Sequence, residues 1–226
     1  MSRLSKFVFS LAALLVLAAA TTSVRADTIT VTGVDSGQFS TATVVCEFNS
    51  QTNTFTFTIT NTSAITQPGS TSTITAIGYD LPPVGNASAS GLNGFTGMQA
   101  PSLSSNFTFS DGDVGNISHG FDNAVMDFAF LTGPSGNFSG GSVNDGLLPG
   151  ESASFTVSGA AFAGFTEEEI CNAIFVRFQN VPEEGGSGGS DVGVPGTPSE
   201  VPEPSTILLL GSALVGLGGY ARRRLK

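Results

Sequence analysis

The sequence predicts an all-β chain: an antiparallel β-sandwich of about seven to nine strands, preceded by a cleaved signal peptide and followed by a single C-terminal transmembrane helix. Three observations support this fold class. Short stretches alternate apolar residues with threonine or serine, clusters of Gly, Pro, Asn and Asp separate these stretches, and an apolar run lies close to each end of the chain. Alternation with period two is typical of strands with one buried face, and Gly and Pro clusters mark turns.

The N-terminus has the three parts of a secretory signal peptide. Arg3 and Lys6 come first, an apolar stretch covers about residues 7–20, and small residues lead to Ala26. Signal peptides have this order of a basic, an apolar and a small-residue region. The apolar stretch is shorter than the about 18 residues of a membrane span, so an uncleaved anchor is the less favoured alternative. We predict that residues 1–26 are a signal peptide, cut after Ala26.

Residues 27–181 form one predicted domain of short strands. The clearest strand lies in TFTFTITNT (54–62), where Phe and Ile alternate with Thr. The polar residues 49–53 before it indicate a hairpin, and the preceding strand covers 38–48. This many short strands separated by turn signals favour a sandwich, with a barrel as the alternative. The other expected strands cover 28–34, 72–79, 106–110, 124–131, 151–158 and 173–179.

A single helical turn is predicted before Cys171. Thr166 is followed by three glutamates, of which Glu169 stands three residues after the threonine. In this capping-box pattern the threonine hydroxyl accepts the backbone N–H of the third helical residue, and the glutamate side chain accepts the N–H of the threonine.

Cys46 and Cys171 are the only cysteines of the chain. A signal peptide would direct them to an oxidising compartment, and each lies in or beside a predicted strand, so we expect a disulfide between them. Two alternatives remain, namely two buried free thiols and a nucleophilic cysteine served by His119. Catalysis is the least favoured of these, because an activated thiolate needs an electropositive setting that this chain lacks.

The rest of the chain divides into a linker over 182–200 and a tail over 201–226. The linker is rich in Gly, Ser and Pro and shows no apolar periodicity. The tail begins with Pro202-Glu203-Pro204, continues with an uncharged apolar run over 205–220, and ends with Arg222-Arg223-Arg224. As a helix, that run is about 25 Å long, slightly less than the hydrocarbon thickness of a bilayer. It is therefore a short span, whose basic end stays cytoplasmic.

The part of the chain between the two targeting segments is strongly acidic. Residues 27–200 contain 17 Asp and Glu residues and a single basic residue, Arg177. Nucleic acid is excluded as a partner, because proteins neutralise its phosphates with Lys and Arg. Anionic lipid surfaces are disfavoured for the same reason. Divalent cations are the natural counter-ions of such a domain.

The sequence offers few parts for catalysis. His119 is the only histidine and the predicted domain has no lysine, which leaves most hydrolase, transferase and zinc sites incomplete. A carboxylate pair of the glycosidase kind remains open. However, sugar sites usually present aromatic platforms, and the domain has no Trp and one tyrosine, Tyr79. We predict that the chain is not an enzyme and that it has no catalytic residues and no cofactor.

A weak calcium candidate lies in SDGDVGNISHGFDNAVMDF (110–128). Asp111 and Asp113 begin this segment like an acidic calcium loop, with oxygen ligands on a Gly-rich turn. The pattern then departs, because Gly115 occupies the third acidic position and no glutamate follows at the bidentate position. A polar turn between two strands is the favoured interpretation.

The tail resembles a known sorting signal. The order of Pro202-Glu203-Pro204, a short apolar segment and a terminal arginine cluster is similar to the PEP-CTERM signal of Gram-negative bacterial surface proteins. In that family a membrane-embedded exosortase, thought to be a cysteine transpeptidase, recognises the tail near the Pro-Glu-Pro motif. The resemblance covers residues 201–226.

The resemblance implies an exported structural protein of the cell surface or extracellular matrix, associated with exopolysaccharide or biofilm. Its expected partners are the exosortase, the cytoplasmic membrane during sorting, and matrix polysaccharide. From the residues alone the alternative is a calcium-dependent adhesin or another ligand-binding module, held as a plain type I membrane protein.

Overall fold

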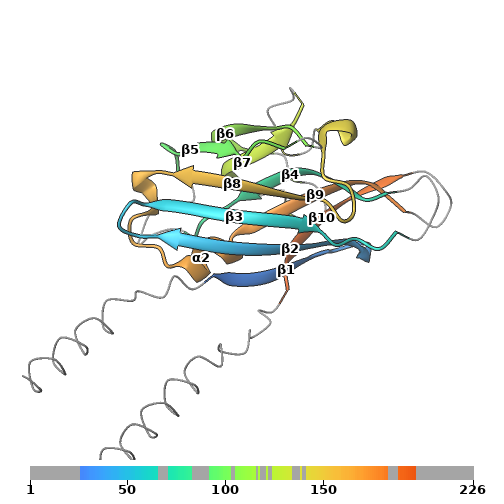
Figure 1. Ribbon diagram of the computed structural model, residues 1–226, viewed down its shortest axis with the longest axis horizontal. Helices are drawn as coiled ribbons and strands as arrows, with labels where there is room; N and C mark the ends of the chain where they lie inside the picture. The colour runs from blue at the N-terminus through green and yellow to red at the C-terminus, as the bar shows by residue number, and fades with distance from the viewer. Residues whose placement is uncertain are drawn as a thin grey trace, which may run out of the picture.

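A computed structural model describes residues 26–65, 71–82, 92–102, 105–115, 117, 121, 124–133, 138, 141–182 and 188–196. The described chain is built from antiparallel strands with three short helices (Figure 1). The strands are β1 (Asp27–Gly33), β2 (Gly37–Asn49), β3 (Thr54–Asn61), β4 (Thr73–Tyr79), β5 (Thr96–Gln99), β6 (Phe107–Val114), β7 (Met126–Thr132), β8 (Ser152–Ser158), β9 (Ile174–Val181) and β10 (Gly189–Pro195). The helices are η1 (Val143–Asp145), η2 (Ala160–Phe162) and α2 (Glu167–Asn172).

All ten strands belong to one nearly closed sheet, in the order β5-β8-β3-β2-β1-β10-β9-β4-β7-β6. The all-β antiparallel class is confirmed, but ten strands in one sheet replace the expected seven to nine strands of a two-sheet sandwich. The difference arises at β1, which hydrogen-bonds to β2 on one side and to β10 on the other. β1 therefore joins two halves of the sheet that would otherwise be separate layers. The sheet is strongly curved, so its two edge strands, β5 and β6, contact each other.

Each of the eight expected strands is present, with its ends shifted, and the structure adds two strands that the sequence does not predict. One is β5, which is only four residues long and contains a glycine. The other is β10, which lies inside the range 182–200 that the sequence predicts as a linker. Because β10 pairs with both β1 and β9, the folded domain extends to Pro195. Because β10 contains glycines and polar residues, its sequence shows no clear apolar periodicity.

The main core lies between the two halves of the sheet and is dominated by phenylalanine. Phe55, Phe57 and Ile59 of β3 point into it, as the alternation predicts. The ring of Phe57 stacks on Phe155 of β8 with ring centroids 5.0 Å apart. Aromatic pairs at this separation add to the free energy gained from area burial.

The opposite face of β3 carries threonine hydroxyls that pair with hydroxyls of β8. Thr58 lies 2.7 Å from Ser154, and Thr60 lies 2.7 Å from Ser152, measured between the hydroxyl oxygens. Cross-strand hydroxyl pairs of this kind stabilise an antiparallel sheet. Ser and Thr, which are abundant in the sequence, thus form an uncharged and hydrogen-bonded outer face on β3 and β8.

Two neighbouring strands of the sheet, β4 and β7, are buried on both faces. Every residue of β4 and of β7 is buried. A second apolar cluster, separate from the main core, contains Ala76 of β4, Ala129 of β7, Val192 of β10 and, from the loops, Ile117 and Phe138. A strand buried on both faces has a nearly continuous apolar sequence instead of an alternating one. The sequences TITAIGY and MDFAFLT fit that description.

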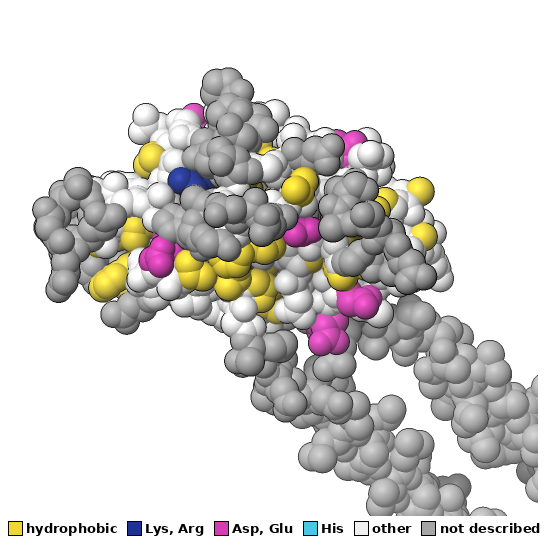
Figure 2. Space-filling model, turned by 180° about the vertical axis from the view of Figure 1, so that it is seen from behind, with side chains coloured by type: hydrophobic (Ala, Val, Ile, Leu, Met, Phe, Trp, Pro, Cys, Tyr) yellow, Lys and Arg dark blue, Asp and Glu magenta, His cyan; other side chains and the backbone are white. Residues whose placement is uncertain are grey.

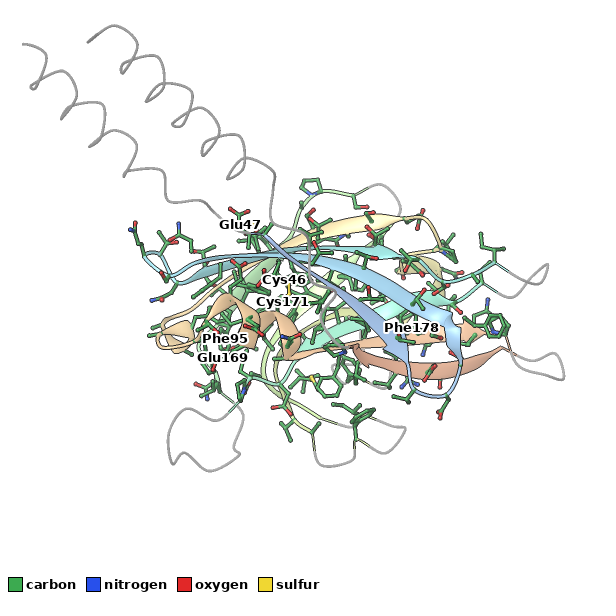
Figure 3. The ribbon with its side chains drawn as sticks, turned by 90° about the horizontal axis from the view of Figure 1, so that it is seen from below. Cys46, Glu47, Phe95, Glu169, Cys171 and Phe178 are labelled. Atoms are coloured by element: carbon green, nitrogen blue, oxygen red, sulfur yellow. A yellow bond between two sulfur atoms is a disulfide. The ribbon has the colours of Figure 1, made fainter. Side chains whose placement is uncertain are left out.

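A disulfide joins Cys46 of β2 to Cys171 of α2, as the sequence predicts, across 125 residues. Its Cα atoms are 6.0 Å apart, and both residues are fully buried. The capping box at the start of α2 is also confirmed, because Thr166 and Glu169 exchange both expected hydrogen bonds. Figure 3 shows Cys46 and Cys171 next to each other, with Glu169 of the same helix as Cys171 also labelled.

The predicted signal peptide, apart from Ala26, and the predicted tail both lie outside the described residues. This includes Pro202, Glu203, Pro204 and the arginines at 222–224. Within the described ranges, no helix combines the length and the apolar composition needed to cross a membrane.

Candidate functional site

The carboxylate of Asp111, the first calcium candidate, accepts backbone hydrogen bonds. The N–H groups of Gly94 and Phe95, just before β5, donate to its two oxygens at 3.0 and 2.9 Å. Among the described residues, no three His, Cys, Asp or Glu side chains are placed to hold a metal ion. The side chain of Asp113 and the whole of His119 lie outside the described residues. Asp111 and Asp113 both lie within β6, at an irregularity between Asp111 and Val114, so the favoured interpretation of these two residues as a polar turn between strands is wrong.

Asp127 of the same segment is used in a similar way. Its side chain is buried, and its oxygens accept the backbone N–H groups of Leu81, at 2.7 Å, and of Leu92. Both donors flank the connection between β4 and β5. Together with Asp111, this carboxylate fixes the two ends of that connection against β6 and β7.

The contact between β5 and β6 is closed by side chains. Gln99 donates from its amide nitrogen to the Ser105 hydroxyl at 2.9 Å and accepts the backbone N–H of Phe107 at 2.8 Å. The ring of Phe109 fills the space where a Cβ atom would lie at Gly97. Side chains therefore bind backbone hydrogen-bonding groups at the edges of the sheet, where a strand of another chain could otherwise pair.

We expect Asp111→Ala to lower the free energy of unfolding by about 2 kcal/mol, because two backbone N–H groups lose a charged acceptor. Urea unfolding of the wild type and the variant measures this difference. Asp111→Asn is the control, and its loss of stability should be smaller, because the amide oxygen still accepts a hydrogen bond from one of the two backbone N–H groups. Repeating the measurement with calcium tests the alternative: a calcium site at Asp111 would make the wild type more stable as the calcium concentration rises above the Kd, and would leave the variant unchanged. Equal stability of wild type and Asp111→Ala without calcium would contradict the structural role.

The one basic residue of the region 27–200, Arg177, lines an open cavity of about 780 Å³. Its side chain is only 7% exposed, and burial lowers its pKa. The described lining also includes Gln179, Asn180 and Ser190, so it offers guanidinium, amide and hydroxyl groups. These groups bind polar partners, but none is a general acid or base near neutral pH.

The described charged side chains are sparse on the outside. On the face drawn in Figure 2, Asp and Glu side chains are scattered, Lys and Arg occur at one place, and hydrophobic side chains gather near the middle.

Tyr79, the one tyrosine of the predicted domain, stacks on Phe128 in the core with ring centroids 4.9 Å apart. It is fully buried, and that burial raises its pKa well above the usual value. It therefore provides no stacking surface for a sugar.

Carboxylates meet at the N-terminal end of β1. Glu167, in the first turn of α2, accepts the backbone N–H of Phe48 at 2.6 Å and also a backbone hydrogen bond from Asp27. Burial raises the pKa of Glu167, and the charges of Asp27 and Glu47 raise it further, while the two backbone hydrogen bonds lower it. The exposed Ala26, at the predicted cleavage site, stands directly before this strand.

The sequence does not predict the structural role of a buried carboxylate in β10. Asp191 is 1% exposed, and its oxygens accept the backbone N–H groups of Asp35, at 3.3 Å, and Ser36, at 2.9 Å, as well as the Ser36 hydroxyl. These donors belong to the turn between β1 and β2, 155 residues earlier in the chain. An aspartate beside Val192 in a segment otherwise poor in apolar residues gives no local signal of such a role.

Residues 200–224 match the family model of the PEP-CTERM protein-sorting motif. Neither a curated protein nor a solved structure is detectably similar to the chain. The sorting motif is thus the one part of the chain for which a known family is identified, and it coincides with the segment singled out by its Pro-Glu-Pro sequence.

Proposed function

Because residues 200–224 carry a PEP-CTERM protein-sorting motif, we propose that the chain is an exosortase-sorted structural protein of the cell surface or extracellular matrix. The motif implies export, cell-surface targeting and an exosortase as the processing partner. In our proposal, Pro202, Glu203 and Pro204 are the recognition site, and the apolar run with Arg222-Arg223-Arg224 holds the precursor in the cytoplasmic membrane. The tail is then removed.

Export through a cleaved signal peptide is part of this proposal. A cut after Ala26 would free Asp27, which is the first residue of β1, so no residue of the sheet would be lost. The exposure of Ala26 supports access to the peptide bond that follows it.

A structural role, without catalysis, is supported by what the described carboxylates do. Asp111, Asp127 and Asp191 all accept backbone hydrogen bonds that hold loops or turns against strands. Two apolar clusters, a cross-linking disulfide and paired hydroxyls on the outer face make a well-packed, cross-linked and acidic body. We propose that this body is a matrix component associated with exopolysaccharide, and that it takes no nucleic acid because it has one basic residue against 17 acidic ones.

Replacing Pro202-Glu203-Pro204 with three alanines in a producing cell tests the proposal. We expect the wild-type protein at the surface or in the medium without its tail, and the variant retained in the membrane with the tail attached. Cell fractionation with intact-mass measurement of the C-terminus distinguishes these outcomes. Pro198→Ala, a proline exchange four residues before the motif, is the matched control and should leave sorting unchanged. A wild-type protein that keeps its tail would reject the proposal in favour of a plain membrane anchor.

A further inference from the structure

We propose that Glu167 is a binding site for the α-ammonium group of Asp27, which signal-peptide cleavage creates at the start of the mature chain. This inference rests on the proposed cleavage after Ala26. Hydrolysis of the Ala26–Asp27 peptide bond consumes one water molecule, leaves a carboxylate on Ala26 and leaves an ammonium group on Asp27. A neutral N–H donor is thereby replaced, on the same nitrogen, by a cationic one.

The first residue of β1 is Asp27, and α2, which carries Glu167, packs against both β1 and β2. Asp27 pairs with Cys46 in the β1–β2 ladder, and Phe48, two residues further along β2, donates its N–H to the Glu167 carboxylate at 2.6 Å. The backbone of Asp27 forms a hydrogen bond with the same carboxylate. Glu167 therefore connects the ends of two neighbouring strands, and cleavage would create the mature N-terminus at one of these ends.

The carboxylate is also held in place from its own side. Glu167 begins α2, the Thr166–Glu169 capping box fixes the first turn of that helix, and Cys171 ties the helix to β2. Figure 3 shows Cys46 and Cys171 joined, with Glu47 on the neighbouring position of β2. A preorganised acceptor of this kind loses little entropy when an ammonium group binds.

The charges around Glu167 favour a cation. Asp27 on β1 and Glu47 on β2 both act on it with like charge. On α2 itself, Glu168 is exposed and Glu169 is hydrogen-bonded to Thr166. All of these charged groups on β1, β2 and α2 are acidic. In the uncleaved chain, Glu167 is therefore half-buried and has carboxylates as its charged neighbours. The ammonium group would supply the opposite charge next to Glu167.

The ion pair has a defined pH window. An ammonium group bound by a carboxylate has a raised pKa, so its contribution is complete below the ordinary α-amino pKa of about 7.7–8.0 and is lost as the pH rises above it. At the acid side the contribution is lost when Glu167 is protonated, and burial raises the pKa of this carboxyl above its ordinary value. The stabilisation of the mature chain over an uncleaved one is therefore expected in mildly acidic to neutral solution, and it is lost as the pH rises through the raised pKa of the ammonium group.

Two chains that differ only at the N-terminus test the proposal. One runs from Asp27 to Lys226, and the other carries Gly-Ser-Gly-Ala before Asp27, which restores a peptide N–H there and moves the charge away. At about pH 6.5 we expect the first chain to melt about 2–4 °C higher, a difference that disappears at about pH 10. In Glu167→Gln the difference should disappear at both pH values, whereas Glu168→Gln, the same charge change one residue along the helix, should keep it.

The pKa of the α-amino group is the second readout. Residues 27–225 contain no lysine, so the N-terminal amine and Lys226 are the only reactive amines of the test chain that runs from Asp27 to Lys226. Reductive methylation with carbon-13 followed by NMR titration therefore reports the N-terminal amine directly. We expect it to titrate above about 7.7–8.0 in the wild type and to return to that range in Glu167→Gln. An ordinary pKa in the wild type, or no effect of Glu167→Gln, overturns the inference. Mass measurement of the exported protein's N-terminus separately tests the cleavage itself.

Discussion

Reducing the Cys46–Cys171 disulfide is expected to lower the free energy of unfolding by about 5 kcal/mol, because the cross-link closes a loop with a sequence separation of 125. The physical reason is that the open chain gains conformational freedom in the unfolded state. For a domain of this size, the melting temperature should fall by roughly 10–20 °C. Calorimetry of oxidised and reduced wild type measures the effect with no change in side-chain volume.

The Cys46→Ala/Cys171→Ala double variant is the companion to that experiment. It removes the cross-link and also two buried sulfur atoms, so we expect it to be somewhat less stable than the reduced wild type. Each single variant leaves one buried thiol and no cross-link, and should resemble the reduced protein. If reduction left the melting temperature unchanged, the disulfide would contribute nothing to the stability of the fold.

Replacing Asp191 with alanine is expected to cost about 3 kcal/mol, because the turn between β1 and β2 loses its charged acceptor while its donors stay partly buried. The melting temperature should fall by about 6–12 °C. Hydrogen exchange read by mass spectrometry should show the loss of protection first in β10 and in residues 34–36, since this side chain joins them.

Asp35→Asn is the control for that prediction. Asp35 is an exposed residue of the same turn, and its substitution leaves the Asp191 carboxylate in place. We expect its stability to lie within about 0.5 kcal/mol of the wild type. Uniform loss of protection across the whole sheet in Asp191→Ala, without an early change at β10, would show that the side chain does not hold that strand locally.

Local pattern was enough to predict most strands but not their closure into one sheet. The alternation in β3 defines both its length and its buried face, and the capping box defines the start of α2. In contrast, the single sheet depends on β1 meeting β10, two strands from opposite ends of the domain. No window of sequence contains both partners, and β10 itself is held by an aspartate that bonds to a turn 155 residues away.

The same distinction separates the two candidate sites. The sorting motif is a contiguous order of residues, so it could be recognised from the sequence. Glu167 could not, because its role depends on the nitrogen of Asp27 and on the N–H of Phe48, which only the folded chain brings together. The acidic segment 110–128 looked like a cation loop because its carboxylates are close in sequence. In the structure the described ones point to separate backbone donors.

The position of β10 determines how the domain carries a pulling force. This strand is the last one before the sorting segment, and it lies in the interior of the sheet, hydrogen-bonded to β1 on one edge and to β9 on the other. Tension applied through a C-terminal attachment therefore enters at a strand that must break two ladders to be pulled out, as well as its anchor at Asp191. A strand at the edge would resist with one ladder only. Removing β10 from this end of the domain therefore requires more backbone hydrogen bonds to break than removing an edge strand would.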